Sequence, residues 1–435
     1  MDLTPQNILD ALNKHIVGQI DAKKAVAVAF RARMLRKKLK SPIKDEIMPK
    51  NILMIGPTGV GKTEIARRLA KISNSPFIKV EATKYTEIGY VGKDVESIIR
   101  DLAEVAVKNM KEQKYKKYEK EAKKEVRERI VNTLVAQDET MDYKTLQKQY
   151  DKGELDDLEI EIEVEPIQPN NIASFDFPMG GGGGASIGVM QIGDIIGKAF
   201  SSKKKKKASI AEAKEIIFEE IISNLTETED TIKEALELAS EEGIVFIDEI
   251  DKIAFSNNAK GGEVSREGVQ RDLLPLIEGT AVQTKYGTIN TDHILFIGSG
   301  AFYSSKPSDL SPEFQGRFPV RVELKSLSKD DFIQVLVAPE GSLIKQYQAL
   351  LKAEGVSLEF KEDGINEIAE IATKLNTEIE NIGARRLQTI LEKIFHEIMF
   401  NAPSLKQKKV VVDKKFVNSN IDGLKDKIDL AKFIL

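Results

Sequence analysis

The stretch 51–64, Asn-Ile-Leu-Met-Ile-Gly-Pro-Thr-Gly-Val-Gly-Lys-Thr-Glu, constrains the fold of this chain more than any other. Its apolar residues 52–55 predict a buried strand, and the residues after the turn predict a helix with one apolar face. The turn matches G-x-x-x-x-G-K-[ST], in which glycines let consecutive N–H groups point at a polyphosphate. Lys62 would neutralise the β- and γ-phosphates, and the Thr63 hydroxyl would bind Mg²⁺. The stretch therefore predicts a nucleoside triphosphate site in an α/β fold.

A second motif supplies the carboxylates that such a site needs. The apolar run 244–247 predicts another strand, and it ends in Asp248 and Glu249. Asp248 stands where a carboxylate holds the water shell of Mg²⁺. Glu249 would polarise the water that attacks the γ-phosphate. Two acids after a strand are also typical of a solvated turn, but together with the phosphate loop they predict hydrolysis rather than binding alone.

Composition narrows the class of protein. The chain has 435 residues, which suggests roughly two to four domains. A net charge of −4 gives no global argument for nucleic-acid binding. The chain has no cysteine, which excludes disulfides, thiolate catalysis and cysteine-ligated zinc, and which fits a reducing compartment. Neither a signal peptide nor an apolar run long enough to span a membrane is present, so no membrane contact and a cytoplasmic location are expected.

Further strand patterns surround the two motifs. Residues 77–81, 293–297 and 320–324 read as strands, and helical patterns lie between them. Strands that alternate with helices at this spacing are the signature of a parallel sheet. We therefore assign residues 1–109 and 236–324 to one α/β nucleotide-binding core.

Between the halves of this core the character of the sequence changes. Residues 110–235 begin with a dense mixed-charge helix and include a strictly alternating acidic strand at 158–165. Five glycines at 180–184 and five lysines at 203–207 are interpreted as flexible linkers. The segment 110–235 is therefore predicted to be an inserted, mostly helical domain with flexible segments.

Helical patterns dominate both ends of the chain. Thr4 is expected to start a first helix, and Asp21 is expected to cap a second. Residues 325–435 are mostly helical in pattern, with the best helix at 384–400 and one strand-like patch at 409–412. These residues are predicted to form a small helical C-terminal domain.

Three further segments carry patterns with a specific use. Residues 89–92, Gly-Tyr-Val-Gly, predict either a mobile loop with an apolar tip or a hairpin with Tyr90 in the core. Arg317 lies between a glycine and a proline, where it suits an arginine finger that reaches a neighbouring subunit. Residues 383–387 open a helix from which Arg385 could reach the γ-phosphate. Taken alone, each arginine also fits an ordinary surface position.

Together, these motifs resemble the AAA+ family, in its Clp/Hsp100 group of protein unfoldases. The resemblance covers essentially the whole chain, and it rests on Ile16-Val-Gly-Gln19, the phosphate loop, residues 89–92, Asp248-Glu249, Gly316-Arg317 and Gly383-Ala-Arg385. It implies a P-loop NTPase core with a parallel sheet, an inserted intermediate domain that engages substrates, and a helical C-terminal domain. It also implies ATP and Mg²⁺ as cofactors and a homo-oligomeric ring, expected to be a hexamer.

The resemblance also implies residue roles. Catalysis is assigned to Glu249, Lys62 and Arg317. Nucleotide binding is assigned to Val17, Gly59, Val60, Gly61, Lys62, Thr63, Glu64, Asp248, Glu313 and Arg385, with Thr63 and Asp248 serving the metal. Ser299 is the candidate for the first sensor, although many members place Asn or Thr there. The substrate pore loop is Gly89, Tyr90, Val91 and Gly92.

The end of the sequence suggests a partner. Leu430, Phe433, Ile434 and Leu435 are apolar, and such an ending either docks on its own domain or is kept for another protein. The resemblance implies that it docks on a partner peptidase and activates it. The expected function is thus ATP-driven unfolding and threading of protein substrates into that peptidase. The alternative is an AAA+ remodelling ATPase that acts on nucleic acid or on protein complexes without a peptidase.

Overall fold

A computed structural model of the chain describes residues 3–47, 50–86, 93–137, 142–164, 204–254, 266–404 and 409–425. They belong to two compact units. The first comprises Met1–Ala106 and Leu236–Leu435, and the second comprises Val107–Ala235. None of the helices in the described part of the chain is both long enough and apolar enough to cross a membrane.

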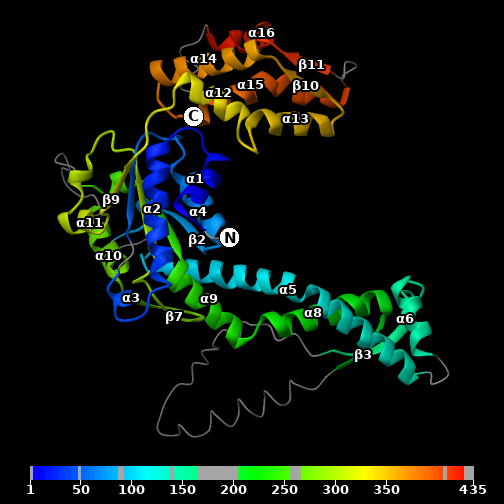
Figure 1. The fold of residues 1–435 in the computed structure, drawn as a ribbon. Helices are drawn as coiled ribbons and strands as arrows, with labels where there is room; N and C mark the ends of the chain where they lie inside the picture. Colours follow the sequence, from blue (N-terminus) through cyan, green and yellow to red (C-terminus); the bar gives the residue numbers. More distant parts are fainter. Residues whose placement is uncertain are drawn as a thin grey trace, which may run out of the picture. The chain divides into compact units, whose positions relative to one another are not determined.

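A five-stranded parallel sheet forms the centre of the first unit (Figure 1). Its strand order is β2-β5-β8-β1-β9, and every neighbouring pair runs parallel. The strands are β1 (Ile52–Ile55), β2 (Phe77–Glu81), β5 (Ile244–Asp248), β8 (Leu295–Gly300) and β9 (Val320–Glu323). The predicted parallel sheet is therefore confirmed. β8 begins two residues later than predicted and continues to Gly300. Gly298, Ser299 and Gly300, which follow the predicted strand end, therefore belong to the strand.

Parallel pairing brings the carboxyl ends of these strands to one edge of the sheet. Ile55 pairs with Gly300, and Glu81 pairs with Asp248. Just beyond this edge the chain leaves β1, and Gly56 N–H donates to Gly300 O at 3.1 Å. In open parallel α/β sheets, ligands bind outside the carboxyl ends of the strands. The sheet therefore puts the phosphate loop and the acidic end of β5 at the edge where ligands bind.

The helices of this part of the first unit are α1 (Pro5–Asn13), α2 (Ile20–Arg36), α3 (Ile43–Glu46), α4 (Lys62–Ser73), α10 (Arg266–Glu278) and α11 (Pro312–Gly316). Of these, α1, α2 and α4 share one apolar cluster with the sheet. A hairpin of β6 (Ala281–Thr284) and β7 (Gly287–Asn290) follows α10. Thr4 caps α1 as predicted, because its side chain accepts a hydrogen bond from Asn7 N–H.

The predicted cap of the second helix is wrong. Gln19 occupies the N-cap of α2, with the left-handed angles φ 55° and ψ 35°, and Asp21 lies inside the first turn. An acidic residue in the first turn still complements the positive end of the helix dipole. Asp21 therefore stabilises the start of the helix through its charge rather than by capping it.

The C-terminal part of the first unit has an apolar cluster of its own. Its helices are α12 (Lys329–Val337), α13 (Leu343–Ala353), α14 (Glu362–Glu378), α15 (Arg385–Asn401) and α16 (Lys414–Lys425). The strand-like patch at 409–412 is the strand β11 (Lys409–Val412), which pairs in parallel with β10 (Ser357–Phe360). β10 was not predicted, because only two of its residues, Leu358 and Phe360, are apolar and face the cluster.

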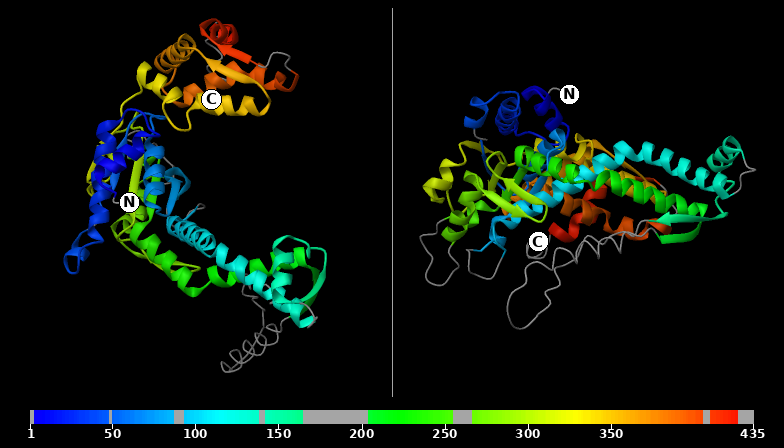
Figure 2. Two further views of the ribbon diagram at one scale, coloured as in Figure 1. Left: turned by 45° about the vertical axis from the view of Figure 1, so that its right-hand side comes forward. Right: turned by 90° about the horizontal axis from the view of Figure 1, so that it is seen from below.

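The second unit is built on helices with a small antiparallel ribbon. It contains most of α5 (Ser97–Gln137), all of α6 (Tyr143–Asp151) and α8 (Ile210–Thr226), and the start of α9 (Glu229–Glu242). The views in Figure 2 show α5 and α8 side by side. The ribbon pairs β3 (Glu159–Val164) with β4 (Lys204–Ser209). The interpretation of the lysine run as a linker is therefore wrong for residues 204–207, which form a strand opposite the acidic one.

Candidate nucleotide site

The phosphate loop is shaped by glycines in backbone conformations that other residues rarely adopt. Gly59 has φ 74°, and Gly61 has φ 104° at the N-cap of α4. A Cβ atom added at Gly59 would lie 2.0 Å from Ile382 O, so a side chain cannot be accommodated there. Val60 is buried beneath the loop. The loop thus leads into the amino end of α4, where backbone N–H groups are free to bind an anion.

Lys62 is the most strongly perturbed group of the loop. Its side chain is only 9% exposed, and Nζ donates to Pro57 O at 2.8 Å and to Gly56 O. Burial lowers the pKa of Lys62 to about 8, while the nearby carboxylates of Asp248 and Asp251 oppose this shift. Arg385 lowers the pKa further through its charge. These interactions gather the predicted loop lysine, an acid of β5 and the first residue of α15 into one electrostatic neighbourhood.

The two predicted acids follow β5 in the expected order. Asp248 Oδ2 forms an ion pair with Lys79 Nζ at 2.9 Å, and Asp248 Oδ1 accepts from Glu249 N–H at 3.1 Å. Glu249 is exposed, has φ 59°, and accepts a hydrogen bond from Thr83 Oγ1 at 3.2 Å through Oε2. A left-handed non-glycine residue is a strained conformation that is common at functional sites. This turn separates the directions of the two neighbouring carboxylates.

Lys79 and Thr83 were not predicted as site residues. They lie on and just after β2, and β2 pairs with β5, so their side chains meet those of Asp248 and Glu249. The sequence feature that could have indicated them is their position at or just after the carboxyl end of the predicted strand 77–81. Asp251 was also missed; it is 8% exposed, and its Oδ1 accepts from Ala301 N–H at 3.3 Å just past β8.

Ser299 lies on β8 and is fully buried. Its Oγ atom has no hydrogen-bond partner among the described residues. A buried hydroxyl without a partner is uncommon in native structures. The sensor role of Ser299 stays a prediction.

The start of α15 touches the phosphate loop directly. Ala384 N–H donates to Gly59 O at 3.0 Å, next to the left-handed Gly383. Arg385 begins α15 and is exposed. Its neighbour Arg386 is only 5% exposed and donates to Glu380 O at 2.9 Å and to Asn376 Oδ1. The two adjacent arginines therefore differ in kind, because Arg386 fixes the local fold while Arg385 is accessible.

Other predicted site residues take less central positions. Val17 is half-buried before α2, and Thr63 is half-buried in the first turn of α4. Glu64 pairs with Arg68 at 2.6 Å and with Arg67 at 3.1 Å. These two ion pairs occupy its carboxylate.

Glu313 and Arg317 lie on and just after α11, and both are exposed. Arg317 Nη2 pairs with Glu278 Oε1 at 2.8 Å, and its Nε donates to the same oxygen at 3.0 Å. Across the described ranges, neither residue forms a hydrogen bond or an ion pair with the phosphate loop. The predicted pore loop, residues 89–92, and the predicted docking tail, residues 430–435, lie outside the described residues.

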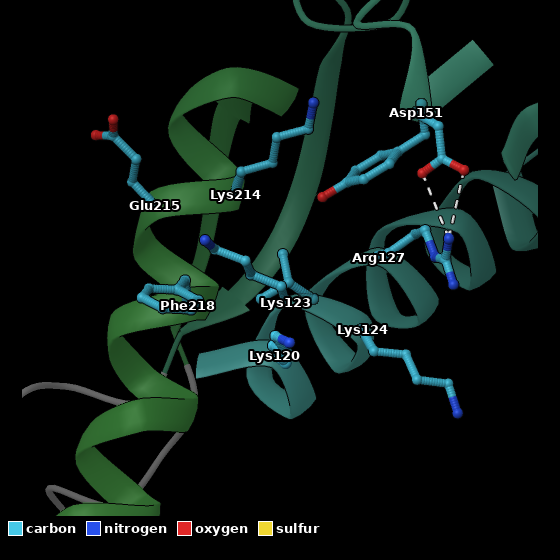
Figure 3. Close-up of a pocket in the computed structure, with 10 residues that line it drawn as sticks. Lys120, Lys123, Lys124, Arg127, Asp151, Lys214, Glu215 and Phe218 are labelled. Carbon is cyan, nitrogen blue, oxygen red and sulfur yellow. Dashed lines mark hydrogen bonds and ion pairs between the residues drawn. The ribbon is translucent and has the colours of Figure 1, made fainter. Parts of the chain in front are cut away.

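A pocket lies in the second unit (Figure 3). It has a volume of about 550 Å³ and lies between α5, α6 and α8. Figure 3 shows Lys120, Lys123 and Lys124 on α5 and Phe218 on α8, with Arg127 paired to Asp151. No predicted site residue lines this pocket. Within the described ranges, no group of three or more His, Cys, Asp or Glu side chains could hold a metal ion.

Comparisons with known proteins agree with this geometry. One family model, described as an AAA domain (Cdc48 subfamily), matches residues 170–321. Another, described as the ATPase family associated with various cellular activities (AAA), matches residues 52–148. Proteins named ATP-dependent protease ATPase subunit HslU from Rickettsia peacockii and Rickettsia conorii are each 55% identical to this chain, and that of Rickettsia felis is 54% identical. Each alignment covers 100% of this chain and 97% of the relative.

Proposed function

The chain belongs to the HslU family of AAA+ ATPases, and from this premise we propose that it unfolds protein substrates with ATP and delivers them to an HslV peptidase. The single observation that carries the proposal is the convergence at the sheet edge. Lys62 is held among Asp248, Asp251 and Arg385, and the acids of β5 follow the expected order. This arrangement suits hydrolysis of a nucleoside triphosphate.

We assign three functional parts to the chain. Residues 1–109 and 236–324 are the nucleotide-binding core, 110–235 are an inserted domain that engages substrates, and 325–435 are a helical domain that ends in a partner-docking tail. Separate apolar clusters support this division, one for each part. Val107–Ala235 also forms a compact unit of its own.

The phosphates would be held by the loop and by the residues that follow it. Backbone N–H groups from Gly59 to Thr63 and the side chain of Lys62 would bind them, while Val17 would line the base. Glu249 would orient and polarise the attacking water. Arg385, at the start of α15, would contact the γ-phosphate from the helical domain.

A magnesium ion fits the donor atoms of this site. The Thr63 hydroxyl and the Asp248 carboxylate are oxygen donors of the kind that Mg²⁺ prefers, and Mg²⁺ usually completes its shell with water and phosphate oxygens. When bound, the ion would supply neutralisation of charge on the β- and γ-phosphates. Lys79 forms an ion pair with Asp248 Oδ2 and so helps to hold that carboxylate in place.

Glu313 and Arg317 would complete the site of a neighbouring copy. Both are exposed, and among the described residues the Arg317 side chain pairs with the exposed carboxylate of Glu278. An exposed ion pair contributes little free energy, so Arg317 can exchange it for a phosphate. This requires a homo-oligomeric ring, which we propose to be a hexamer in the cytoplasm.

Hydrolysis would then change the angle between the core and the helical domain, because contacts of Arg317 and Arg385 to the γ-phosphate are lost. Tyr90 and Val91, between Gly89 and Gly92, would grip the polypeptide in the central pore and move it with the core. Leu430, Phe433, Ile434 and Leu435 would dock on HslV and activate it. Protein chains are the substrates in this scheme, with no role for nucleic acid or a membrane.

Replacing Glu249 by Gln tests the catalytic assignment. The amide keeps the size of the side chain but cannot polarise water, so ATP binding should persist while turnover falls about 100-fold or more. Binding of a fluorescent ATP analogue and release of phosphate measure the two effects. Thr83→Ala, which removes only the hydroxyl that contacts Glu249, is the control and should retain most of the activity. Robust ATP hydrolysis by the Glu249→Gln protein would contradict the catalytic role assigned to Glu249.

The partner assignment is tested with purified HslV. The full chain should stimulate peptide hydrolysis by HslV in the presence of ATP, and a chain without residues 432–435 should not, although its own ATPase activity persists. Stimulation that survives the deletion would mean that the tail is structural. An intact ATPase that never stimulates HslV would favour remodelling without a peptidase.

A further inference from the structure

We propose that Gln19 is a positioning residue that couples the base side of the nucleotide site to the connection between the core and the helical domain. Its side-chain amide makes two hydrogen bonds with the backbone of Lys325. Nε2 donates to Lys325 O at 2.8 Å, and Oε1 accepts from Lys325 N–H at 3.0 Å. One side chain thus satisfies both polar backbone groups of one residue, as a neighbouring strand would. The inference rests on the proposed function, because it assigns a part in ATP-driven domain movement.

The backbone of Gln19 is unusual for a helix start. The residue is the N-cap of α2 in a left-handed conformation, and its side chain makes no capping hydrogen bond. N-cap positions favour short side chains that accept from the first turn, and left-handed angles favour Gly or Asn. Gln satisfies neither preference. The contact with Lys325 gives the longer amide a role that local helix stability does not explain.

Lys325 occupies a short connection between two structural parts. The strand β9 ends at Glu323, and α12 begins at Lys329 after its cap, Ser328. Leu327, within this connection, packs against the apolar clusters of both parts. A few residues at the ends of elements commonly absorb the angle changes of a hinge. Gln19, the N-cap of α2, therefore anchors one end of such a connection to the start of that helix.

The same segment contacts the helical part at two further points. Lys14 O accepts from Glu340 N–H at 3.3 Å. Gly18 lies so close to Asp331 that an added Cβ would be 3.1 Å from its Oδ1 atom. Val17, the candidate that lines the base, lies between these contacts. If nucleotide exchange shifts Val17, it would also shift Gln19, which holds Lys325 in the connection. The contact between Gln19 and Lys325 would then differ between the two nucleotide states, as coupling requires.

The test compares Gln19→Ala and Gln19→Glu with Lys24→Ala, an exposed position on the same helix. Three quantities are measured with the full chain and HslV: kcat and KM for ATP, and the amount of protein substrate degraded per ATP hydrolysed. In both Gln19 variants we expect KM to change less than about twofold and degradation per ATP to fall about tenfold, a typical coupling factor. Glu has the shape of Gln but cannot donate to Lys325 O when ionised, so it separates the hydrogen bond from packing and guards against loss of folding.

Other results would overturn the inference. Unchanged degradation per ATP in both variants would make the contact a passive one. A large rise in KM with unchanged degradation per ATP would make Gln19 part of the nucleotide pocket instead. If the unaltered chain hydrolyses no ATP, or hydrolyses it without degrading substrate, then the proposed function itself fails. That failure is distinguishable because it precedes any comparison of variants.

Discussion

Lys62 titrates in a range where lysine is ordinarily fully charged. Burial lowers its pKa to about 8, and the charges of Asp248 and Asp251 offset only part of that effect. Its ammonium group is nevertheless what a polyphosphate would recognise. The burial that shapes the loop therefore also determines the pH range in which the loop binds well.

We expect nucleotide affinity to fall as the pH rises above about 8. The free protein loses the Lys62 proton near that pH, whereas bound phosphates would retain it, so binding takes up a proton and Kd should rise about tenfold per pH unit. Calorimetric titration with ADP from pH 6.5 to 9.5, in buffers that differ in ionisation enthalpy, measures both Kd and proton uptake. Lys62→Arg keeps its charge and should give a flat, if weaker, profile. A flat profile for the unaltered chain would contradict the expectation.

Arg33 is a buried cation whose partners are backbone carbonyls. Its Nη2 atom donates to Glu241 O at 2.9 Å, Gly243 O at 3.0 Å and His293 O at 2.6 Å. Arg33→Met would remove the donor from these carbonyls, of which Gly243 O keeps a hydrogen bond from Leu295 N–H, and we expect the free energy of unfolding to fall by about 3 kcal/mol. Urea denaturation followed by circular dichroism measures the loss. Lys24→Met, an exposed change on the same helix, should shift the midpoint little; equal shifts would refute the role of Arg33.

At the scale of elements, the approach of α15 to the phosphate loop depends on two glycines. Gly383 has φ 58°, and a Cβ there would lie 2.6 Å from the carbonyl group of Gly59. A Cβ on Gly59 would lie 2.0 Å from Ile382 O. Only this close fit allows Ala384 N–H to reach Gly59 O. The helix that carries Arg385 is thus positioned by contacts between backbones.

Gly383→Ala should separate the helix from the loop. The clash and the left-handed backbone together cost about 1–3 kcal/mol, so ATP turnover should fall about tenfold or more, while far-UV circular dichroism changes little. Gly341→Ala is the matched control, because no atom lies within 4 Å of its added Cβ. If both variants keep full turnover, the contact between loop and helix has no catalytic importance.

The elements that were predicted well have strong local signals. Strands β1 and β2 have the predicted bounds because an apolar run or a preceding proline defines them. β8 begins later than predicted because Ile294, although apolar, ends a turn in which its N–H donates to Thr291 O. Its end, Gly-Ser-Gly, carries no side-chain pattern at all. The lysine strand β4 was missed because its partner β3 is distant in sequence, and no local pattern announces a pairing.

At the scale of the whole molecule, one active site is proposed to need two copies of the chain. Arg317 is held by Glu278 within its own subunit, and no described residue of its own phosphate loop contacts it. The catalytic set would therefore be incomplete in a monomer. We therefore expect ATPase activity to be lost on dilution at the concentrations at which analytical ultracentrifugation shows loss of the ring.

Mixing two inactive variants gives a sharper test. A Lys62→Ala chain cannot bind phosphates but still offers Arg317, and an Arg317→Ala chain has an intact loop but no finger to offer. If the finger acts between subunits, rings assembled from both should recover a substantial part of the activity, because some interfaces contain one intact half from each. Either variant alone should have little activity. No recovery in mixed rings would place Arg317 in its own subunit's site or in a structural role.

The sequence predicted the residues proposed to act on the nucleotide, but not the residues that contact and position them. Lys62, Thr63, Asp248 and Glu249 follow from short local motifs, and the roles predicted for them remain proposals. Lys79, Thr83 and the contact between Gln19 and Lys325 depend on which strands and connections become neighbours. Such contacts join residues as far apart as 19 and 325, and one sequence without its fold contains no measure of them.

The ribbon of β3 and β4 has a consequence for how its alignment is chosen. Glu161 pairs with Lys207 and Glu163 with Lys205, so a slip of β4 by two residues that moves Lys205 opposite Glu161 and Lys207 opposite Glu159 would still put lysines opposite glutamates. Ala208 breaks this degeneracy, because it pairs with Ile160 on the buried face and is itself 4% exposed. A slip would put a lysine in that dry position. One methyl group therefore selects among alignments that the salt-bridging side chains cannot tell apart.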